Sequence, residues 1–140
     1  MLNSLAMSTM RISSRAAALG LAAFALAFSA PPAFAFSASF RWCAGSPSFE
    51  LKDVPADTAK LNFAMTDLNV PSFHHGGGTV AYAGATRTGI SVPCGAFATS
   101  FIGPSPPPGQ VHTYAFTVKA LSAAGAVLAT TTAQRKFPER

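Results

Sequence analysis

The clearest β-strand pattern in the chain is Val111-His112-Thr113-Tyr114-Ala115-Phe116-Thr117-Val118-Lys119-Ala120-Leu121. Every second position, from His112 through Tyr114 to Val118, shares one face, and the positions between them share the other, which is the side-chain period of a β-strand. A turn at Ala124-Gly125 follows, and the β-branched run of residues 127–132 then predicts a returning strand. The alanines of residues 120–129 leave a short helix open as the alternative.

Similar but shorter patterns mark further strands on the N-terminal side. Leu61, Phe63 and Met65 alternate with small or polar residues, which predicts a half-buried strand. Residues 48–52 and 79–82 read as short strands, the second one after a turn at residues 76–78, three consecutive glycines. The 11 glycines and 11 prolines divide the chain into short pieces, and we find no helical periodicity after residue 35. These patterns predict an all-β domain.

The first 35 residues have the pattern of a secretory signal peptide. Arg11 and Arg15 provide a basic start, residues 16–28 carry no charge, and Ala33-Phe34-Ala35 offers a cleavage site between small residues. We expect cleavage after Ala35, which leaves a single domain of residues 36–140 that is exported, to a periplasm or beyond. Retention as an N-terminal anchor is the alternative, but Pro31-Pro32 interrupts the apolar stretch too early for a bilayer core of about 30 Å.

Charge and cysteine usage exclude some classes of function and fit an exported domain. After residue 35 the chain has eight Lys and Arg and five Asp and Glu, with no basic cluster dense enough for a nucleic-acid binder. The same part has no apolar run of about 20 residues, so we expect no transmembrane span after processing. Cys43 and Cys94 lack metal-type spacing. They either form one disulfide or lie separately as buried thiols.

Side chains with chemical potential lie beside Gly- and Pro-rich segments. His74 and His75 precede the three glycines, where the backbone could approach a ligand closely. His112 follows a loop with three consecutive prolines, which is stiff enough to form the wall of a pocket. Asp67 ends a predicted strand, where it could orient a histidine, accept a hydrogen bond from a ligand hydroxyl or amine, or simply form a local Asx turn.

In this order the segments resemble the phosphatidylethanolamine-binding protein family, and most closely its small bacterial Raf-kinase-inhibitor-like (YbhB/YbcL type) members. The resemblance rests on four segments: Asp67-Leu68-Asn69-Val70-Pro71, His74-His75, Gly103-Pro104-Ser105-Pro106-Pro107-Pro108-Gly109 and His112-Thr113-Tyr114. It implies a compact β-sandwich, shortened and without the C-terminal helix of longer members. It also implies a small pocket for phosphate-like anions or phospholipid head groups.

The resemblance also implies which residues form that pocket. Asp67, His75, His112 and Tyr114 would surround the anion, with His74 as a further member, and Gly103 and Pro104 would form the floor or rim. Asn69 and Thr113 replace an acidic and an arginine position of the family pattern, which predicts weak anion affinity or a different ligand. Because a carboxylate favours the imidazolium form of a neighbouring histidine, anion binding should weaken as the pH rises.

We therefore expect a non-catalytic binding protein without a cofactor, and we keep three alternatives. A hydrolase using histidine and aspartate would need a serine or cysteine nucleophile in a recognisable setting, and none is evident. A metal site could be formed by His74, His75 and His112, provided that the first two lie in a loop, since neighbours in a strand point to opposite faces. The stiff loop of residues 104–108 could instead bind a protein partner, as an inhibitor of an exported enzyme.

Overall fold

The structure is a computed structural model that describes residues 35–83, 90–97 and 100–139. Within these ranges the chain forms strands and turns and contains no helix, so none that could cross a membrane. The strands in chain order are β1 (Ser37–Cys43), β2 (Ser46–Lys52), β3 (Lys60–Asp67), β4 (His74–Ala81), β5 (Ile90–Val92), β6 (His112–Leu121) and β7 (Val127–Phe137). The signal peptide predicted at residues 1–35 lies, except for Ala35, outside the described residues and stays a prediction.

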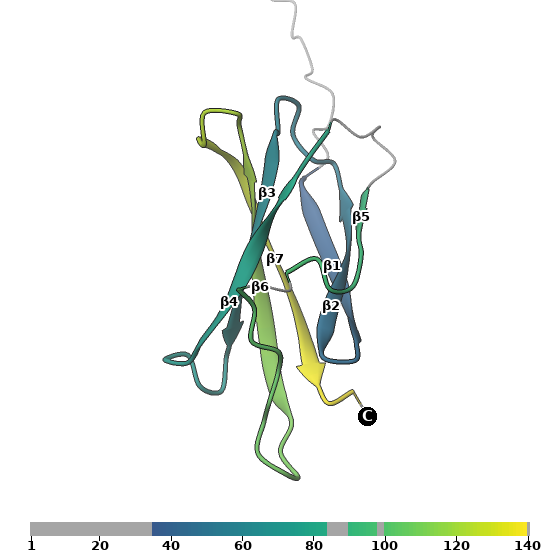
Figure 1. Cartoon of the computed structure of the whole chain (residues 1–140), viewed down its shortest axis with the longest axis vertical. Helices are drawn as coiled ribbons and strands as arrows, with labels where there is room; N and C mark the ends of the chain where they lie inside the picture. The colour runs from purple at the N-terminus through teal and green to yellow at the C-terminus, as the bar shows by residue number, and fades with distance from the viewer. Residues whose placement is uncertain (1–34, 84–89, 98–99, 140) are drawn as a thin grey trace, which may run out of the picture. The chain divides into compact units, whose positions relative to one another are not determined.

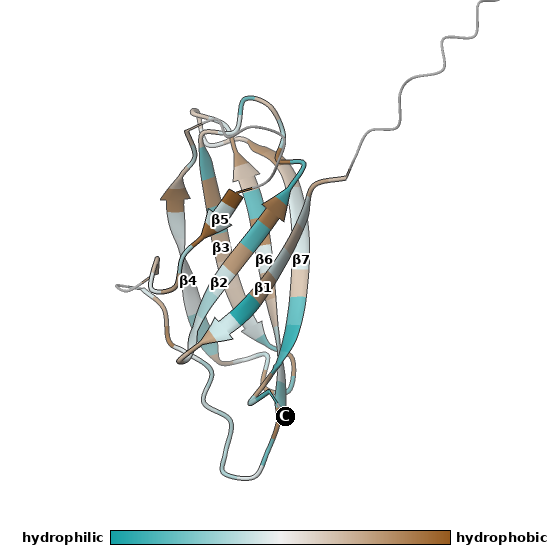
Figure 2. Ribbon diagram, turned by 90° about the vertical axis from the view of Figure 1, so that its right-hand side faces the viewer, coloured by the Kyte–Doolittle hydropathy of each residue, from teal (hydrophilic) through white to brown (hydrophobic). Residues whose placement is uncertain are grey.

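The described strands form two antiparallel sheets that pack face to face (Figure 1). One sheet has the order β1-β2-β5 and the other the order β4-β3-β6-β7. Buried and exposed positions alternate along the strands, and Figure 2 shows the matching bands of hydrophobic and hydrophilic residues on β2. The predicted all-β sandwich is therefore confirmed, and the long alternating stretch forms β6 at the centre of the larger sheet.

Aromatic rings fill the space between the two sheets. Phe49 of β2 lies 4.6 Å from Phe63 of β3 and 4.9 Å from Phe116 of β6, measured between ring centroids. Phe40 of β1 lies 5.1 Å from Phe116. All four rings are buried, and burying a side chain of this size contributes about 1.5–3 kcal/mol. Strands β3 and β6, which carry two of these rings, pair without a register shift up to Asp67 and Tyr114 at the end of the sheet.

The three consecutive glycines lie inside β4, so the turn predicted at residues 76–78 is wrong. A side chain at Gly77 would overlap the carbonyl oxygen of Phe63 on the neighbouring strand, and one at Gly78 would overlap the ring of Phe97. The glycines are therefore needed where other parts of the protein, not a ligand, approach the backbone closely. The helical alternative for residues 120–129 is also excluded, because β6 turns at Gly125 (φ +87°) directly into β7.

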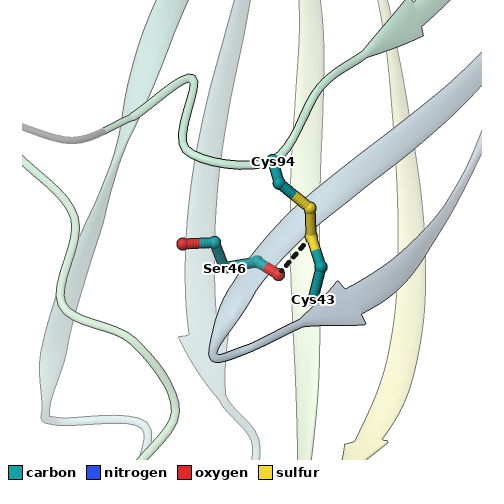
Figure 3. The surroundings of a disulfide bond; sticks show 3 residues. All are labelled: Cys43, Ser46 and Cys94. Carbon is teal, nitrogen blue, oxygen red and sulfur yellow. Dashed lines mark hydrogen bonds between the residues drawn. A yellow bond between two sulfur atoms is a disulfide. The ribbon is translucent and has the colours of Figure 1, made fainter.

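Cys43 and Cys94 form a disulfide, which confirms the first of the two expectations for these residues (Figure 3). The bond joins the end of β1 to the turn after β5, and the two Cα atoms are 6.3 Å apart. The Cys43 sulfur also lies 3.3 Å from the carbonyl oxygen of Ser46. A disulfide sulfur carries no proton, so we regard this approach as a packing contact. Closing a loop of this length contributes about 4 kcal/mol in the chain-entropy model.

Both outer strands of the larger sheet have partners beyond the sheet. Beside β4, the backbone N–H of Gly77 donates to the carbonyl oxygen of Ser100 (3.1 Å), and that of Ile102 donates to the carbonyl oxygen of His75 (2.8 Å). Beside β7, the indole N–H of Trp42 donates to the carbonyl oxygen of Lys136 (2.9 Å). Residues 100–102 and strand β1 therefore lie along the two outer strands of this sheet.

Candidate functional site

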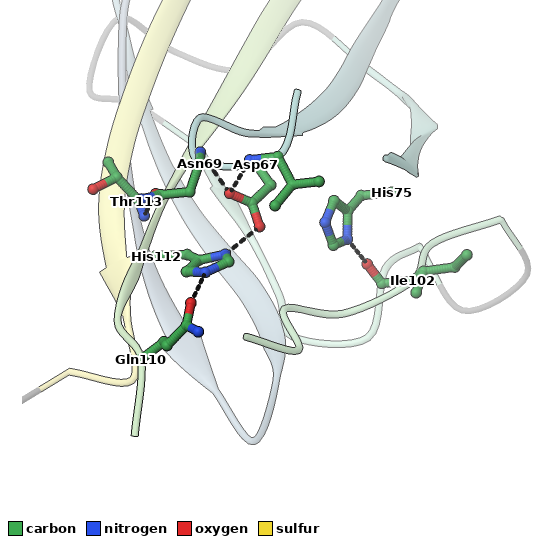
Figure 4. Close-up of polar contacts among 8 residues, drawn as sticks. Asp67, Asn69, His75, Ile102, Gln110, His112 and Thr113 are labelled. Carbon is green, nitrogen blue, oxygen red and sulfur yellow. Dashed lines mark hydrogen bonds and ion pairs between the residues drawn. The ribbon is translucent and has the colours of Figure 1, made fainter. Parts of the chain in front are cut away.

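Asp67 and His112 form a buried pair where β3 ends and β6 begins. The register of the two strands places Asp67 opposite Tyr114, two residues after His112. The Nδ1–H of His112 donates to Oδ2 of Asp67 at 2.7 Å (Figure 4). Side chains two residues apart on a strand face the same way, so the period of β6 places His112 and Tyr114 together on the inner face of the sheet.

The second carboxylate oxygen of Asp67 holds the turn that follows β3. It accepts the backbone N–H groups of Asn69 (2.8 Å) and Val70 (3.2 Å), which is an Asx turn. Asp67 therefore forms the local turn and orients a histidine at the same time. Burial alone would raise the pKa of Asp67, but the hydrogen bonds from His112 and from the two backbone amides together hold it below its ordinary value.

His75 is the buried member of the histidine pair. It faces the core from β4, and its Nδ1–H donates to the carbonyl oxygen of Ile102 at 2.9 Å (Figure 4). Its ring meets the ring of Tyr114 edge-on at 5.4 Å between ring centroids. His74 is the preceding residue of the same strand and is exposed, so it does not join the group.

The hydroxyl of Tyr114 is buried and has no hydrogen-bond partner among the described residues. The carboxylate of Asp67 and the backbone of Ser105 lie near it, but neither meets it with hydrogen-bond geometry. Burial and the negative charge of Asp67 raise the pKa of Tyr114 to about 12. The hydroxyl is therefore a neutral donor at physiological pH, and a buried donor without an acceptor is rare in folded proteins.

The residues of the loop before β6, residues 103–109, do not all contribute to the candidate site. Gly103 packs against the β1–β2 turn, since a Cβ at Gly103 would lie 2.8 Å from the carbonyl oxygen of Gly45. It borders a cavity of about 340 Å³ that none of Asp67, His75, His112 or Tyr114 lines. Pro104 is half-buried and precedes Ser105. The structure thus places Gly103 at a neighbouring cavity and the backbone of Ser105 near the hydroxyl of Tyr114.

Gln110 belongs to the site but was missed in the sequence. Its Oε1 lies 3.1 Å from Nε2 of His112, on the side of the ring opposite Asp67 (Figure 4). The available signal was its position two residues before His112, which places both side chains on the same side of an extended chain. A glutamine is a common surface residue and does not by itself indicate a binding site, so the spacing alone did not identify Gln110 as part of the site.

Asn69 and Thr113 have a structural role that the family pattern does not reveal. The side-chain oxygen of Asn69 accepts the backbone N–H of Thr113 at 2.8 Å, which ties the turn after β3 to β6. Thr113 lies on the face of β6 opposite His112 and Tyr114. A cation at position 113 would therefore not point directly into the space between those two residues.

The structure brings together four of the expected residues at one end of the sandwich: Asp67, His75, His112 and Tyr114. The described side chains include no group of three or more potential metal ligands. Both cysteines are in the disulfide, so neither is a free thiol nucleophile. The site is thus a set of buried hydrogen-bond donors around one carboxylate, carried by a β-sandwich.

These features describe a β-sandwich protein with an Asp-His-Tyr group at one end of the larger sheet. The family model described as "phosphatidylethanolamine-binding protein" matches residues 32–138, and the chain belongs to this family. Neither the comparison with curated proteins nor the comparison with solved structures gave a significant match. The family assignment from the ordered sequence segments is therefore confirmed.

Proposed function

We propose that the protein is an exported, non-catalytic binding protein whose site takes a phosphate-like anion, either free or as the head group of a phospholipid. Tyr114, His112 and His75 supply the donors in this proposal. Asp67 orients the ring of His112 through the hydrogen bond to its Nδ1–H. Members of this family are generally binding proteins without catalytic activity. The YbhB/YbcL type is compatible with this chain.

The buried, unpartnered hydroxyl of Tyr114 carries the proposal. Leaving such a group without a partner costs about 1–3 kcal/mol of folding free energy, a cost that a bound acceptor would remove. The nearby carboxylate of Asp67 is already engaged by His112 and two backbone amides. An anionic oxygen entering between His112 and Tyr114 would accept from donors held in place before it arrives.

Export is supported by two independent features of the chain. The N-terminal pattern of basic, apolar and small residues is typical of a signal peptide, and the Cys43–Cys94 disulfide is compatible with an oxidising compartment. N-terminal sequencing of the secreted or periplasmic protein tests the proposal directly. A mature chain that begins at Phe36 supports it, and an uncleaved chain in the cytoplasm would contradict it.

Titration calorimetry tests the binding site with two soluble probes, inorganic phosphate and phosphoethanolamine, and one neutral control, ethanolamine without phosphate. A hydrogen bond to a charged group contributes about 1.5–3 kcal/mol. Tyr114→Phe should therefore weaken phosphate binding by about tenfold or more. His74→Ala is the matched control, because His74 is exposed on the other face of β4, and it should bind like the wild type.

Two further measurements separate the possible ligands and mechanisms. Flotation with vesicles containing phosphatidylethanolamine or phosphatidylcholine shows whether a lipid head group is bound in a membrane or whether only the free anion binds. Phosphate affinity measured at both ends of a pH range tests whether a protonated histidine takes part in binding, and we expect the affinity to be lower at the higher pH. Equal affinity at both ends would remove the imidazolium from the mechanism, and no binding of any probe would refute the proposed function.

A further inference from the structure

Gln110 reaches the site from a turn that fixes its position. The backbone N–H of Gln110 donates to the carbonyl oxygen of Pro107 at 3.0 Å, and Gly109 between them has φ +84°. Proline and then glycine at the two central positions define a type II turn, in which the glycine supplies the positive φ. The Pro108-Gly109 pair therefore presents Gln110 to His112 from a stiff support.

The Gln110 side chain occupies the one ring nitrogen of His112 that a ligand could use. Nδ1 of His112 is held by Oδ2 of Asp67 at 2.7 Å. Nε2 faces Oε1 of Gln110 at 3.1 Å. Both nitrogens can donate to oxygen acceptors at once only when the ring carries two protons. An anion that binds His112 must therefore take the position that the amide oxygen holds.

We propose that the Gln110 side chain is a built-in competitor that selects anionic over neutral ligands, an inference that rests on the proposed function. A neutral oxygen ligand would replace one neutral acceptor by another and would gain little. A phosphate oxygen forms a charge-assisted hydrogen bond, about twice as strong as a neutral one, and so displaces the amide. Gln110 is exposed, so its side chain can swing into solvent without disturbing the core.

Three variants test the competitor by calorimetry with inorganic phosphate. Gln110→Ala removes the competing oxygen and should tighten phosphate binding about 2- to 10-fold, the range expected for one hydrogen bond. Gln110→Glu places a carboxylate beside the same nitrogen and should weaken binding by more than tenfold. Gln134→Ala is the matched control, since Gln134 is the other glutamine of the chain and is exposed on β7, and it should equal the wild type.

The nitrogen chemical shifts of the His112 ring provide a readout that does not depend on any ligand. Without phosphate, Gln110→Ala should shift the Nε2 resonance and leave Nδ1 unchanged, and an unmoved Nε2 would overturn the inference. Equal phosphate affinity of the wild type and Gln110→Ala would also overturn it, while leaving the proposed function intact. If no variant binds phosphate although Nε2 shifts, the proposed function fails, and with it the role of Gln110 as a competitor.

Discussion

Replacing Tyr114 by phenylalanine should make the protein more stable and a poorer binder. The substitution deletes one oxygen and keeps the ring, which packs against Trp42 at 5.8 Å and His75 at 5.4 Å between ring centroids. Because the hydroxyl is buried without a partner, its removal should relieve part of a desolvation cost of about 1–3 kcal/mol. We expect the free energy of unfolding to rise by about 1 kcal/mol. For a domain of this size that corresponds to roughly 4–8 °C in Tm.

Urea denaturation measures this change directly. The chain has one tryptophan, and Trp42 contacts the mutated ring, so its fluorescence should be paired with circular dichroism, which does not depend on that contact. Tyr82→Phe shows the effect of the same deletion at the other tyrosine of the chain, which is half-buried.

A result in the opposite direction would be decisive. If Tyr114→Phe lowers the free energy of unfolding by 1 kcal/mol or more, the hydroxyl has a partner in the folded protein. The inference that it is free to receive a ligand would then be wrong.

Three more predictions follow from titration and backbone geometry. The pKa of Tyr114 is raised to about 12 in the folded protein. The stabilisation that comes from keeping this hydroxyl protonated is fully present below pH 10, and the free energy of unfolding should decline by roughly 1.4 kcal/mol per pH unit above it. Urea denaturation at pH 9 and 11 should show this decline, and Tyr114→Phe should abolish it. Asp67 has a lowered pKa, so Asp67→Asn should cost about 3–5 kcal/mol at pH 7. The deficit should begin to shrink as the pH falls below about 4 and should vanish only below the still lower pKa of the folded state; a deficit that does not shrink at all in acid would contradict the ion-pair account. Ala44 adopts φ +50° in the turn between β1 and β2, so Ala44→Asn, which tolerates this conformation better, should raise the unfolding free energy by about 0.5–1 kcal/mol in calorimetric melts, and a destabilised variant would refute it.

Strands β2, β3, β6 and β7 were predictable because their chemistry is local, whereas β1 was not identified in the sequence. The alternation around Phe63 and Phe116 follows directly from burial on one face, and it identifies β3 and β6 from the sequence alone. The interior of β4 was missed because glycine is the usual turn residue, whereas Gly77 and Gly78 are required here by contacts with distant residues. Strand β5 has only three residues, and no local pattern identifies so short a segment.

The site was predictable only in part for a related reason. Asp67 and His112 lie at the predicted ends of two strands, so the pairing of β3 with β6 was enough to bring them together. The choice between His74 and His75 depended on which alternate positions of β4 face the core. The glycines that follow have no side chains, so the sequence shows no alternation that would reveal this. Gln110 was missed because its importance comes from the contact of its Oε1 with Nε2 of His112 in the folded protein, and a glutamine in a loop does not by itself indicate a functional residue.

The coverage of both outer strands of the larger sheet has a consequence for self-association. An exposed strand edge is a template on which a second chain can add its own strand and begin to aggregate. Here residues 100–102 already occupy backbone groups of β4 around Gly77, and Trp42 of β1 binds the backbone of β7 at Lys136. The protein should therefore tolerate high concentration without growing into fibres through this sheet.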